Sequence, residues 1–547
     1  MGAGAQQVLG KPRRHLASCS PIGSRGVRPK TFLLTGQALA AGRICKPVEY
    51  VKICSLYGAG YYYIPGTDVC MRIGGYIRQE WSYGYGDNMT NGPFVSTSMQ
   101  NTRIDGNREL VWRTRAYITQ ETRQQTQYGT LRTFLNLGVN GNNSFDFSAN
   151  RAFIQIAGFT VGLASSYFDH YSVAAIAYLV DQSSDTGDGG RAVFAYTAQL
   201  GNGISASLSL EEPESKRAGV WNTQIATNNL IASSTTPGTT PSNNGVGLTI
   251  QPTAGPTLGI TGTTQIMQDQ RNSALPDIVA NIRADGAWGS FQLMAALHES
   301  SGGYFGQTKT GSVAFGHPGN QLGWAVGAGL RVNLPMIGPG DYIAFQAGYS
   351  EGAVRYISNT GGNSGQAGFN GQTSLGYGFW SDGVYCGPGA GTFNTSCPGD
   401  TTVQMTTAWG FAGGFEHFWT PSLRTSLHGS YVAIRYNATA NALICGTQNI
   451  AGVNGANTIS FAAAGASGVD TCNNNWNFWQ IGSRTQWNLS KDFYMGVDVA
   501  YYKLETASEG AVVNYSQLGG SAQPNGLRTV ADQDALAVRV RWHRDLP

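Results

Sequence analysis

Charged side chains are scarce in this sequence. Asp, Glu, Lys and Arg together make up only 12% of the 547 residues, about half of the roughly 25% that is usual in a soluble globular protein. Glycine is abundant instead, with 75 residues, and aromatic residues account for 11%. A helical protein of this length would need many more Leu, Ala, Glu and Lys residues. The composition therefore favours an all-β protein with wide turns.

Long hydrophobic runs are missing as well. The longest nearly apolar stretch, residues 171–180, is about half of the ~20 residues that a membrane-spanning helix needs, and the mean hydropathy is −0.19. The sequence therefore excludes a helical membrane protein. It leaves a membrane barrel open, because barrel strands alternate apolar with polar residues and their hydropathy averages to near neutrality.

Basic residues are concentrated at the N-terminus. Eight of the 35 lie within residues 1–48, where there is no acidic residue, so the remainder carries 27 basic and 32 acidic residues. The main part of the chain is therefore mildly acidic, and it has no basic patch of the kind that binds nucleic acid. We expect no nucleic-acid partner.

The N-terminal segment, residues 1–45, has some features of an export signal. Basic residues precede the short apolar stretch Phe32–Leu34, and Ala38–Ala40 has the form of a signal-peptidase site. The apolar stretch is short, however, and Gly36 and Gln37 interrupt it. The segment is either a degenerate signal peptide or an export signal that was lost through a wrong start assignment.

The eight cysteines include no CxxC motif and no other spacing typical of a zinc site, so we expect neither a metal nor another cofactor. Six of them form local pairs in polar segments, which favours disulfides formed in an oxidising compartment such as the periplasm or the cell surface. Unpaired thiols are the alternative. The candidate pairs are Cys54 with Cys70, Cys386 with Cys397, and Cys445 with Cys472.

Strand patterns recur from about residue 70 to the C-terminus. In each, one face is apolar and the other is polar or small, with a period of two residues. The last strand is the clearest example: its apolar face consists of Leu536, Val538, Val540 and Trp542, and its other face of Ala537, Arg539, Arg541 and His543.

Seven short turns alternate with eight long polar loops along this region, so we predict sixteen strands. The short turns lie near 123–127, 157–160, 201–203, 287–289, 335–340, 419–421 and 490–492. The long loops lie near 84–107, 140–150, 167–190, 213–275, 300–321, 351–402, 438–474 and 508–531. This arrangement is typical of an antiparallel transmembrane β-barrel with short periplasmic turns and long extracellular loops. Its apolar face meets lipid, and its polar face lines an interior too wide for side chains to fill.

Several separated stretches resemble the porin family of alphaproteobacteria. They are Val48–Cys54, Tyr57–Thr67, Arg72–Tyr76, Arg113–Tyr117, Tyr128–Arg132, Leu275–Asn281 and Phe415–Arg424. The resemblance covers residues 46–547 and implies a general diffusion channel of the outer membrane that assembles as a homotrimer. The chain departs from the family in residues 1–45 and at its C-terminus, where His543–Pro547 replaces the terminal aromatic residue that serves as an assembly signal.

The working part of such a barrel is a constriction, formed where the third long loop folds into the lumen. Counting loops places it at residues 167–190. We expect the acidic residues of this loop to face a basic wall formed by the first three strands, which would create a transverse electric field that orders water and selects ions. The candidate loop acids are Asp169, Asp181, Asp185 and Asp188, and the candidate wall residues are Arg72, Arg78, Arg113, Arg115 and Arg132. Alternatively, these charges are only solvated surface groups.

The predicted organisation has three parts: the N-terminal segment 1–45, a periplasmic lead-in at 46–69, and the transmembrane barrel at 70–547. The predicted function is passive diffusion of small hydrophilic solutes and ions across the outer membrane. A substrate-specific channel is an alternative, as is a surface adhesin using the long loop 213–275. We expect no enzyme, because the His–acid pairs in the sequence are chain neighbours, which point to opposite faces of a strand.

Overall fold

The computed structural model describes most of the chain from residue 52 to residue 546. The gaps in this description are 85–92, 94–109, 142–144, 171–175, 180–185, 187–189, 214–216, 224–248, 253–257, 262–273, 306–315, 359–364, 371–373, 380, 388–400, 449–471 and 516–525. The N-terminal segment 1–45, for which a degenerate signal peptide is one interpretation, and the start of the lead-in lie outside the described residues. Within the described part, no helix has the length and apolar character needed to span a bilayer.

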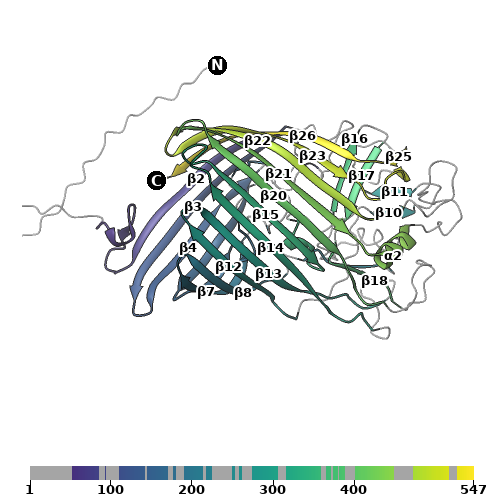
Figure 1. Ribbon diagram of the computed structural model, residues 1–547, viewed down its shortest axis with the longest axis horizontal. Helices are drawn as coiled ribbons and strands as arrows, with labels where there is room; N and C mark the ends of the chain where they lie inside the picture. Colours follow the sequence, from purple (N-terminus) through teal and green to yellow (C-terminus); the bar gives the residue numbers. More distant parts are fainter. Residues whose placement is uncertain are drawn as a thin grey trace, which may run out of the picture.

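Sixteen antiparallel strands close into a barrel, because the first strand pairs with the last as well as with the second (Figure 1). The strands are β2 (Cys70–Tyr83), β3 (Leu110–Thr126), β4 (Gly129–Gly141), β5 (Phe145–Ile156), β6 (Phe159–Ala164), β7 (Arg191–Gly201), β8 (Ile204–Glu211), β12 (Asp277–Gly286), β13 (Gly289–Ser300), β14 (Gln321–Asn333), β15 (Tyr342–Glu351), β20 (Thr407–Phe418), β21 (Leu423–Arg435), β22 (Trp476–Ser490), β23 (Phe493–Glu505) and β26 (Gln533–Leu546). The predicted sixteen-stranded antiparallel barrel is confirmed. Closure leaves no strand edge unpaired, as a lipid environment requires.

The two faces of the barrel wall differ as the alternation predicts. Large apolar side chains such as Ile77, Trp112 and Leu208 point outward and are about half exposed. Their neighbours on the inner face include buried polar groups such as Glu80 and Gln346. An apolar exterior and a polar interior are the pattern of a membrane barrel, and the reverse of a soluble one.

The second long loop is shorter than the sequence predicts. β4 continues to Gly141 and β5 already begins at Phe145, so the expectation of a loop over 140–150 is wrong. A β-bulge explains the error: Asn136 pairs with Arg151 while Leu137 pairs with Ala149, which leaves one extra residue in β5. A bulge shifts the period-two alternation by one residue, and the part of β5 before the bulge is therefore hidden from a pattern search.

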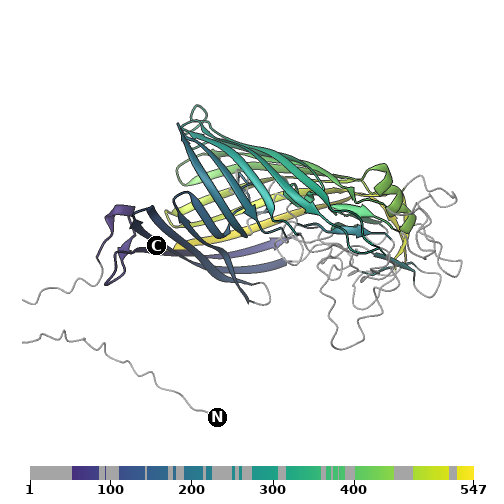
Figure 2. The ribbon, with the colours of Figure 1, turned by 90° about the horizontal axis from the view of Figure 1, so that it is seen from below.

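The short-turn end of the barrel carries the lead-in. It contains the 3₁₀ turn η1 (Ser55–Tyr57) and β1 (Tyr62–Tyr63), which pairs with the start of β2. A disulfide between Cys54 and Cys70 ties the two together, and this predicted pair is confirmed. Figure 2 shows the lead-in at the opposite end of the barrel from helix α2 (Ala438–Gln448).

Folded loop segments cover the long-loop end. In the described part of the chain they form three small sheets. The first consists of β9 (Val220–Asn222), β18 (Gly383–Tyr385) and β19 (Gln404–Met405), and the second of β16 (Gly365–Asn370), β17 (Ser374–Phe379), β24 (Val512–Tyr515) and β25 (Gly526–Val530). The third is the pair β10 (Thr249–Pro252) and β11 (Leu258–Thr261). A 3₁₀ turn, η5 (Val354–Tyr356), and α2 complete this region. The predicted disulfide between Cys445 and Cys472 is confirmed. Cys386 is disulfide-bonded, but its predicted partner Cys397 lies outside the described residues.

Candidate functional site

The segment between β6 and β7, residues 165–190, is called the inner loop here. At its start, the Ser166 hydroxyl and the Tyr167 backbone N–H both donate to the Glu211 carboxylate of β8, at 2.8 Å each. Farther on, the backbone N–H of His170 donates to Oε1 of Gln346 on β15, at 2.9 Å. These partners all point into the barrel, so the loop turns inward as soon as it leaves β6.

Two buried side chains of the inner loop pack against the inner wall. The ring of His170 lies 2.9 Å from the Ser290 hydroxyl. Burial lowers the pKa of His170 to about 4, and the positive charges of Arg283 and Arg331 contribute to the shift, so the ring is neutral at physiological pH. Ile176 is fully buried in a small apolar cluster with residues of β15 and β20, which holds the middle of the loop against the wall.

The far attachment point of the inner loop is Tyr178, on the opposite side of the barrel. The Asp498 carboxylate of β23 accepts the backbone N–H groups of Tyr178 and Leu179, at 2.6 and 2.9 Å. The Tyr178 hydroxyl donates to Gln486, at 2.8 Å, and the Arg541 guanidinium lies 4.0 Å from the centre of its ring. The loop is therefore held across the whole lumen, from β6 to β23 and β26.

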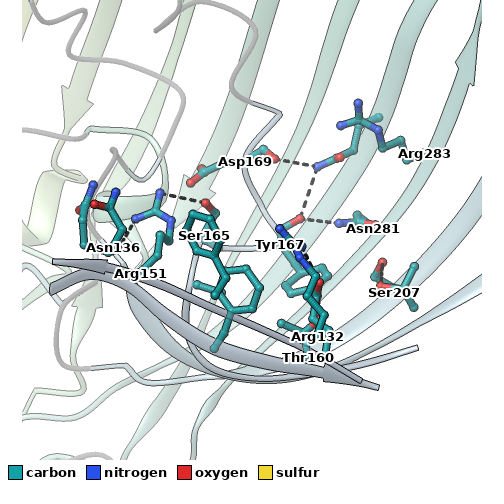
Figure 3. A pocket seen from close by; sticks show the side chains of 18 of the residues that line it. Arg132, Asn136, Arg151, Thr160, Ser165, Tyr167, Asp169, Ser207, Asn281 and Arg283 are labelled. Atoms are coloured by element: carbon teal, nitrogen blue, oxygen red, sulfur yellow. Dashed lines mark hydrogen bonds between the residues drawn. The ribbon is translucent and has the colours of Figure 1, made fainter. Parts of the chain in front are cut away.

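A cavity of about 730 Å³ remains between the start of the inner loop and the wall formed by β2–β8, β12 and β13 (Figure 3). Five arginines line it: Arg78, Arg115, Arg132, Arg151 and Arg283. Asp169 is the one acidic residue among the lining residues, all of which the structure describes. The surface of this cavity is therefore strongly basic.

The five predicted wall arginines separate into two groups. Arg78, Arg115 and Arg132 line the cavity. The structure does not bring Arg72 and Arg113 to it. Arg72 is half exposed and pairs with Glu121 at 2.8 Å, and Arg113 is buried, with its Nε 2.8 Å from Glu80.

Sequence reasoning missed one cavity arginine and left another unassigned to the constriction. Arg151 follows the bulge in β5, and its Nη2 donates to the Ser165 hydroxyl of the inner loop, at 3.0 Å (Figure 3). A sequence signal for Arg151 exists, because Arg151, Phe153 and Gln155 alternate with Ala152 and Ile154. This alternation places Arg151 on the inner face of β5. Arg283 of β12 is not among the predicted wall residues, and the structure places it at the cavity.

Arginines outnumber carboxylates in three ion-pair clusters of the inner wall, those around Glu121, Glu80 and Glu416. Glu121 is paired with three of them, Arg72, Arg123 and Arg132, at 2.7–2.8 Å. Glu80 lies between Arg113 and Arg541, and Glu416 lies between Arg424 and Arg484. Each cluster therefore keeps net positive charge, even though every carboxylate in it is paired.

Arg78 and Arg115 have uncharged hydrogen-bond partners. Nε of Arg78 donates to Nδ1 of His543, at 3.0 Å, a bond that requires this nitrogen to be unprotonated. Nε of Arg115 donates to Oδ1 of Asn140, also at 3.0 Å. Neither arginine forms an ion pair with a carboxylate in the described part of the chain, so both contribute a full positive charge to the cavity.

Of the four predicted loop acids, Asp169 is the one that the structure describes, and its carboxylate is engaged within the inner loop. Asp169 is buried, and its carboxylate accepts the backbone N–H of Thr186 at 2.7 Å as well as the hydroxyl of the same residue. It thus joins the outgoing and returning arms of the inner loop. Asp181, Asp185 and Asp188 lie outside the described residues.

A sixteen-stranded barrel with an apolar exterior and a polar lumen crossed by one inner loop is the architecture of an outer-membrane porin. The family model of a porin subfamily matches residues 43–537, and the chain belongs to this porin family. The predicted membership of the alphaproteobacterial porins and the predicted outer-membrane location are thereby confirmed.

Two relatives and one solved structure illustrate how close these similarities are. Porin Omp2b of Brucella canis is 29% identical over 274 residues, which are 46% of this chain and 59% of the relative. Porin Omp2b of Brucella suis is 32% identical over 195 residues, or 32% of this chain and 47% of the relative. The matches thus span about half the length of these relatives. The outer membrane channel DcaP of Acinetobacter baumannii shares the fold, with a TM-score of 0.52 at 11% identity, over 88% of this chain and 99% of DcaP.

Proposed function

We propose that this chain forms a water-filled channel through which small hydrophilic solutes and ions cross the outer membrane by passive diffusion. One observation carries the proposal. The inner loop is fixed across the lumen at both ends, yet a cavity of about 730 Å³ remains beside it. A pore that is narrowed but not closed selects solutes by size and charge. This role requires no catalytic residue and no cofactor, and we propose that the protein is not an enzyme.

The constriction in this proposal is the passage between the inner loop and the cavity wall. Its basic side consists of Arg78, Arg115 and Arg132, to which we add Arg151. The low-dielectric walls of a narrow passage strengthen the field of such charges. Arg72 and Arg113 contribute through their ion-pair clusters rather than by direct contact with a solute.

Channel formation is tested by refolding the purified protein into a planar lipid bilayer and recording single-channel currents. We expect stepwise, long-lived openings, and we expect chloride to pass more readily than potassium, because the passage is lined by arginines. If a barrel with the correct β-sheet spectrum gives no openings, the proposed channel is wrong and the surface-adhesin interpretation gains support.

We also propose that the protein assembles as a homotrimer through the outer face of β2–β4. Polar side chains lie on this face: the Thr114 hydroxyl donates to Gln79 at 2.6 Å, and Gln120 lies farther along the same strand. Polar groups that face lipid are unfavourable, and contact with a second subunit would remove them from the lipid.

Replacement of both Gln79 and Thr114 by leucine is therefore expected to convert trimers into monomers while leaving the barrel folded. Leucine is compatible with lipid, but it cannot form the hydrogen bonds of a polar subunit contact. The matched control is a double leucine variant of Thr425 and Thr485, a hydroxyl pair 3.1 Å apart on the outer face of β21 and β22. Light scattering in detergent measures the oligomer. A trimer that survives the Gln79 and Thr114 changes would place the subunit contact elsewhere.

A further inference from the structure

We propose that the cavity beside the inner loop is a binding site for small aromatic carboxylates, which bind there briefly on their way through the pore. This inference rests on the proposed channel function and specifies one class of its solutes. It is derived from two neighbouring features of the cavity wall: a pair of stacked phenyl rings and a set of guanidinium groups beside them.

The apolar feature is formed by Phe134 of β4 and Phe153 of β5, which are cross-strand neighbours on the lumen face. Their ring centres are 5.4 Å apart and the rings are tilted by 23°. Both are partly exposed and line the cavity, in a section of wall that is otherwise rich in polar residues such as Asn136 and Gln155. Apolar side chains in a water-filled lumen lose the stabilisation of burial, and such a patch commonly marks a ligand site.

The cationic feature directly adjoins these rings. The guanidinium carbon of Arg132 lies 5.5 Å from the centre of the Phe134 ring and 5.4 Å from that of Phe153. Arg151 precedes Phe153 by two residues and therefore points to the same face of β5. The site thus offers aromatic surface and positive charge side by side, which suits a ligand that carries a ring and an anionic group.

Arg115 and Arg78 have donors available for the anionic group. Each uses its Nε in a hydrogen bond within the protein, to Asn140 and His543 respectively. Within the described part of the chain, the terminal amino groups of these two guanidiniums form no hydrogen bond. A guanidinium presents a planar pair of donors that matches a carboxylate, and such charge-assisted bonds are stronger than neutral ones.

The charge of the cavity decides between anions and cations. Five arginines and one acid line it, and that acid, Asp169, is already bound by Thr186. An aromatic amine would meet the phenyl pair but would be repelled by the arginines. An aliphatic carboxylate would meet the arginines but gain nothing from the rings. An aromatic carboxylate satisfies both features, so the site favours this class.

The test uses single-channel recordings in potassium chloride with benzoate, acetate or benzylammonium added to one side. Benzoate is expected to interrupt the chloride current at concentrations about tenfold lower than acetate, in keeping with the contribution of aromatic contacts, and benzylammonium is expected to have no effect. The F134L/F153L variant keeps apolar side chains but lacks the rings. In this variant, benzoate is expected to interrupt the current only at the concentrations that acetate requires. In Arg115→Gln, both benzoate and acetate are expected to interrupt the current only at higher concentrations than in the unchanged protein.

The matched control is F345L/F411L, which removes another stacked phenyl pair, with ring centres 6.0 Å apart, from the lipid-facing side of β15 and β20. Its response to benzoate is expected to equal that of the unchanged protein. Equal potency of benzoate and acetate in a conducting channel would overturn the aromatic site while leaving the channel function intact. Benzoate block that survives F134L/F153L would likewise overturn it. Absence of any openings would overturn the proposed function and this inference with it.

Discussion

Replacement of both Arg78 and Arg115 by glutamate is expected to reverse the ion preference of the channel, from anions to cations. In a salt gradient across the bilayer, the reversal potential should change sign relative to the unchanged protein. The expected change in the permeability ratio of chloride to potassium is at least tenfold, which corresponds to about 1.4 kcal/mol. This is the largest effect on selectivity that we expect from any two residues of the cavity.

The position and the partners of these two residues explain the size of the effect. Both line the cavity beside the inner loop, where low-dielectric walls limit screening by salt. Their hydrogen-bond partners, His543 and Asn140, are uncharged and leave the full positive charge of each guanidinium facing the passage. The two replacements together change the charge of the cavity lining by four units. Of the three arginines that remain, Arg132 and Arg283 are already paired with carboxylates, those of Glu121 and Asp285.

Arg544→Glu is the control for this reversal. Arg544 lies near the short-turn end of β26 and is half exposed, and it pairs with Asp492 at 3.0 Å. The change alters the net charge of the protein by the same two units per residue, but outside the cavity, so the reversal potential should stay unchanged. A shift in Arg544→Glu equal to that of a single Arg115→Glu variant would mean that overall charge, rather than the cavity, sets the selectivity.

The barrel could be predicted from the sequence because its determinants are local. In β26, Leu536, Val538 and Val540 alternate with polar or small residues, and this period-two pattern specifies both the strand and the face that meets lipid. The alternation of short turns with long loops then gives the number of strands. The bulge in β5 shows the limit of this reasoning, because a single extra residue was enough to hide the start of that strand.

The candidate site could be predicted only in part, because its contacts join residues that are far apart in sequence. Arg113 and Arg115 lie on the same face of β3. Strand pairing nevertheless sets Arg113 opposite Glu80, where it is buried, and sets Arg115 between Arg78 and Asn140 at the cavity. Arg541 reaches the same Glu80 from the other end of the chain. The alternation shows on which face of the strand a side chain lies, but it does not show how deeply the side chain is buried or which residues it contacts.

The contacts that attach the inner loop to the barrel wall could not be predicted from local sequence patterns either. Counting loops identified residues 167–190 as the segment expected to enter the lumen. The residues that hold it there, Gln346 and Asp498, are 176 and 320 positions away from the backbone groups that they bind. Nothing in the sequence around Asp498 distinguishes it from other inward polar residues of β23. Its role depends on where the loop comes to lie.

Asp498→Ala is therefore expected to release the inner loop and to raise the single-channel conductance several-fold, with increased current noise. The Asp498 carboxylate accepts the backbone N–H groups of Tyr178 and Leu179, and its other oxygen lies 3.0 Å from Nε2 of His428. Its removal leaves two buried N–H groups without their acceptor, at a cost of about 1–3 kcal/mol each. A loop that detaches at this point no longer narrows the lumen on the side of β23 and β26.

Asp341→Ala provides the matched comparison. Asp341 is also a buried carboxylate that accepts a backbone N–H, that of Phe418 at 2.8 Å, and it contacts a histidine, His417. It lies in the turn between β14 and β15, and it makes no hydrogen bond or ion pair with the described residues of the inner loop. Its loss should lower the thermal stability of the barrel but leave the conductance unchanged. If Asp498→Ala also loses stability without any gain in conductance, Asp498 does not keep the passage narrow, and the inner loop is held by its other contacts, which include the Tyr178 side chain and the buried Ile176.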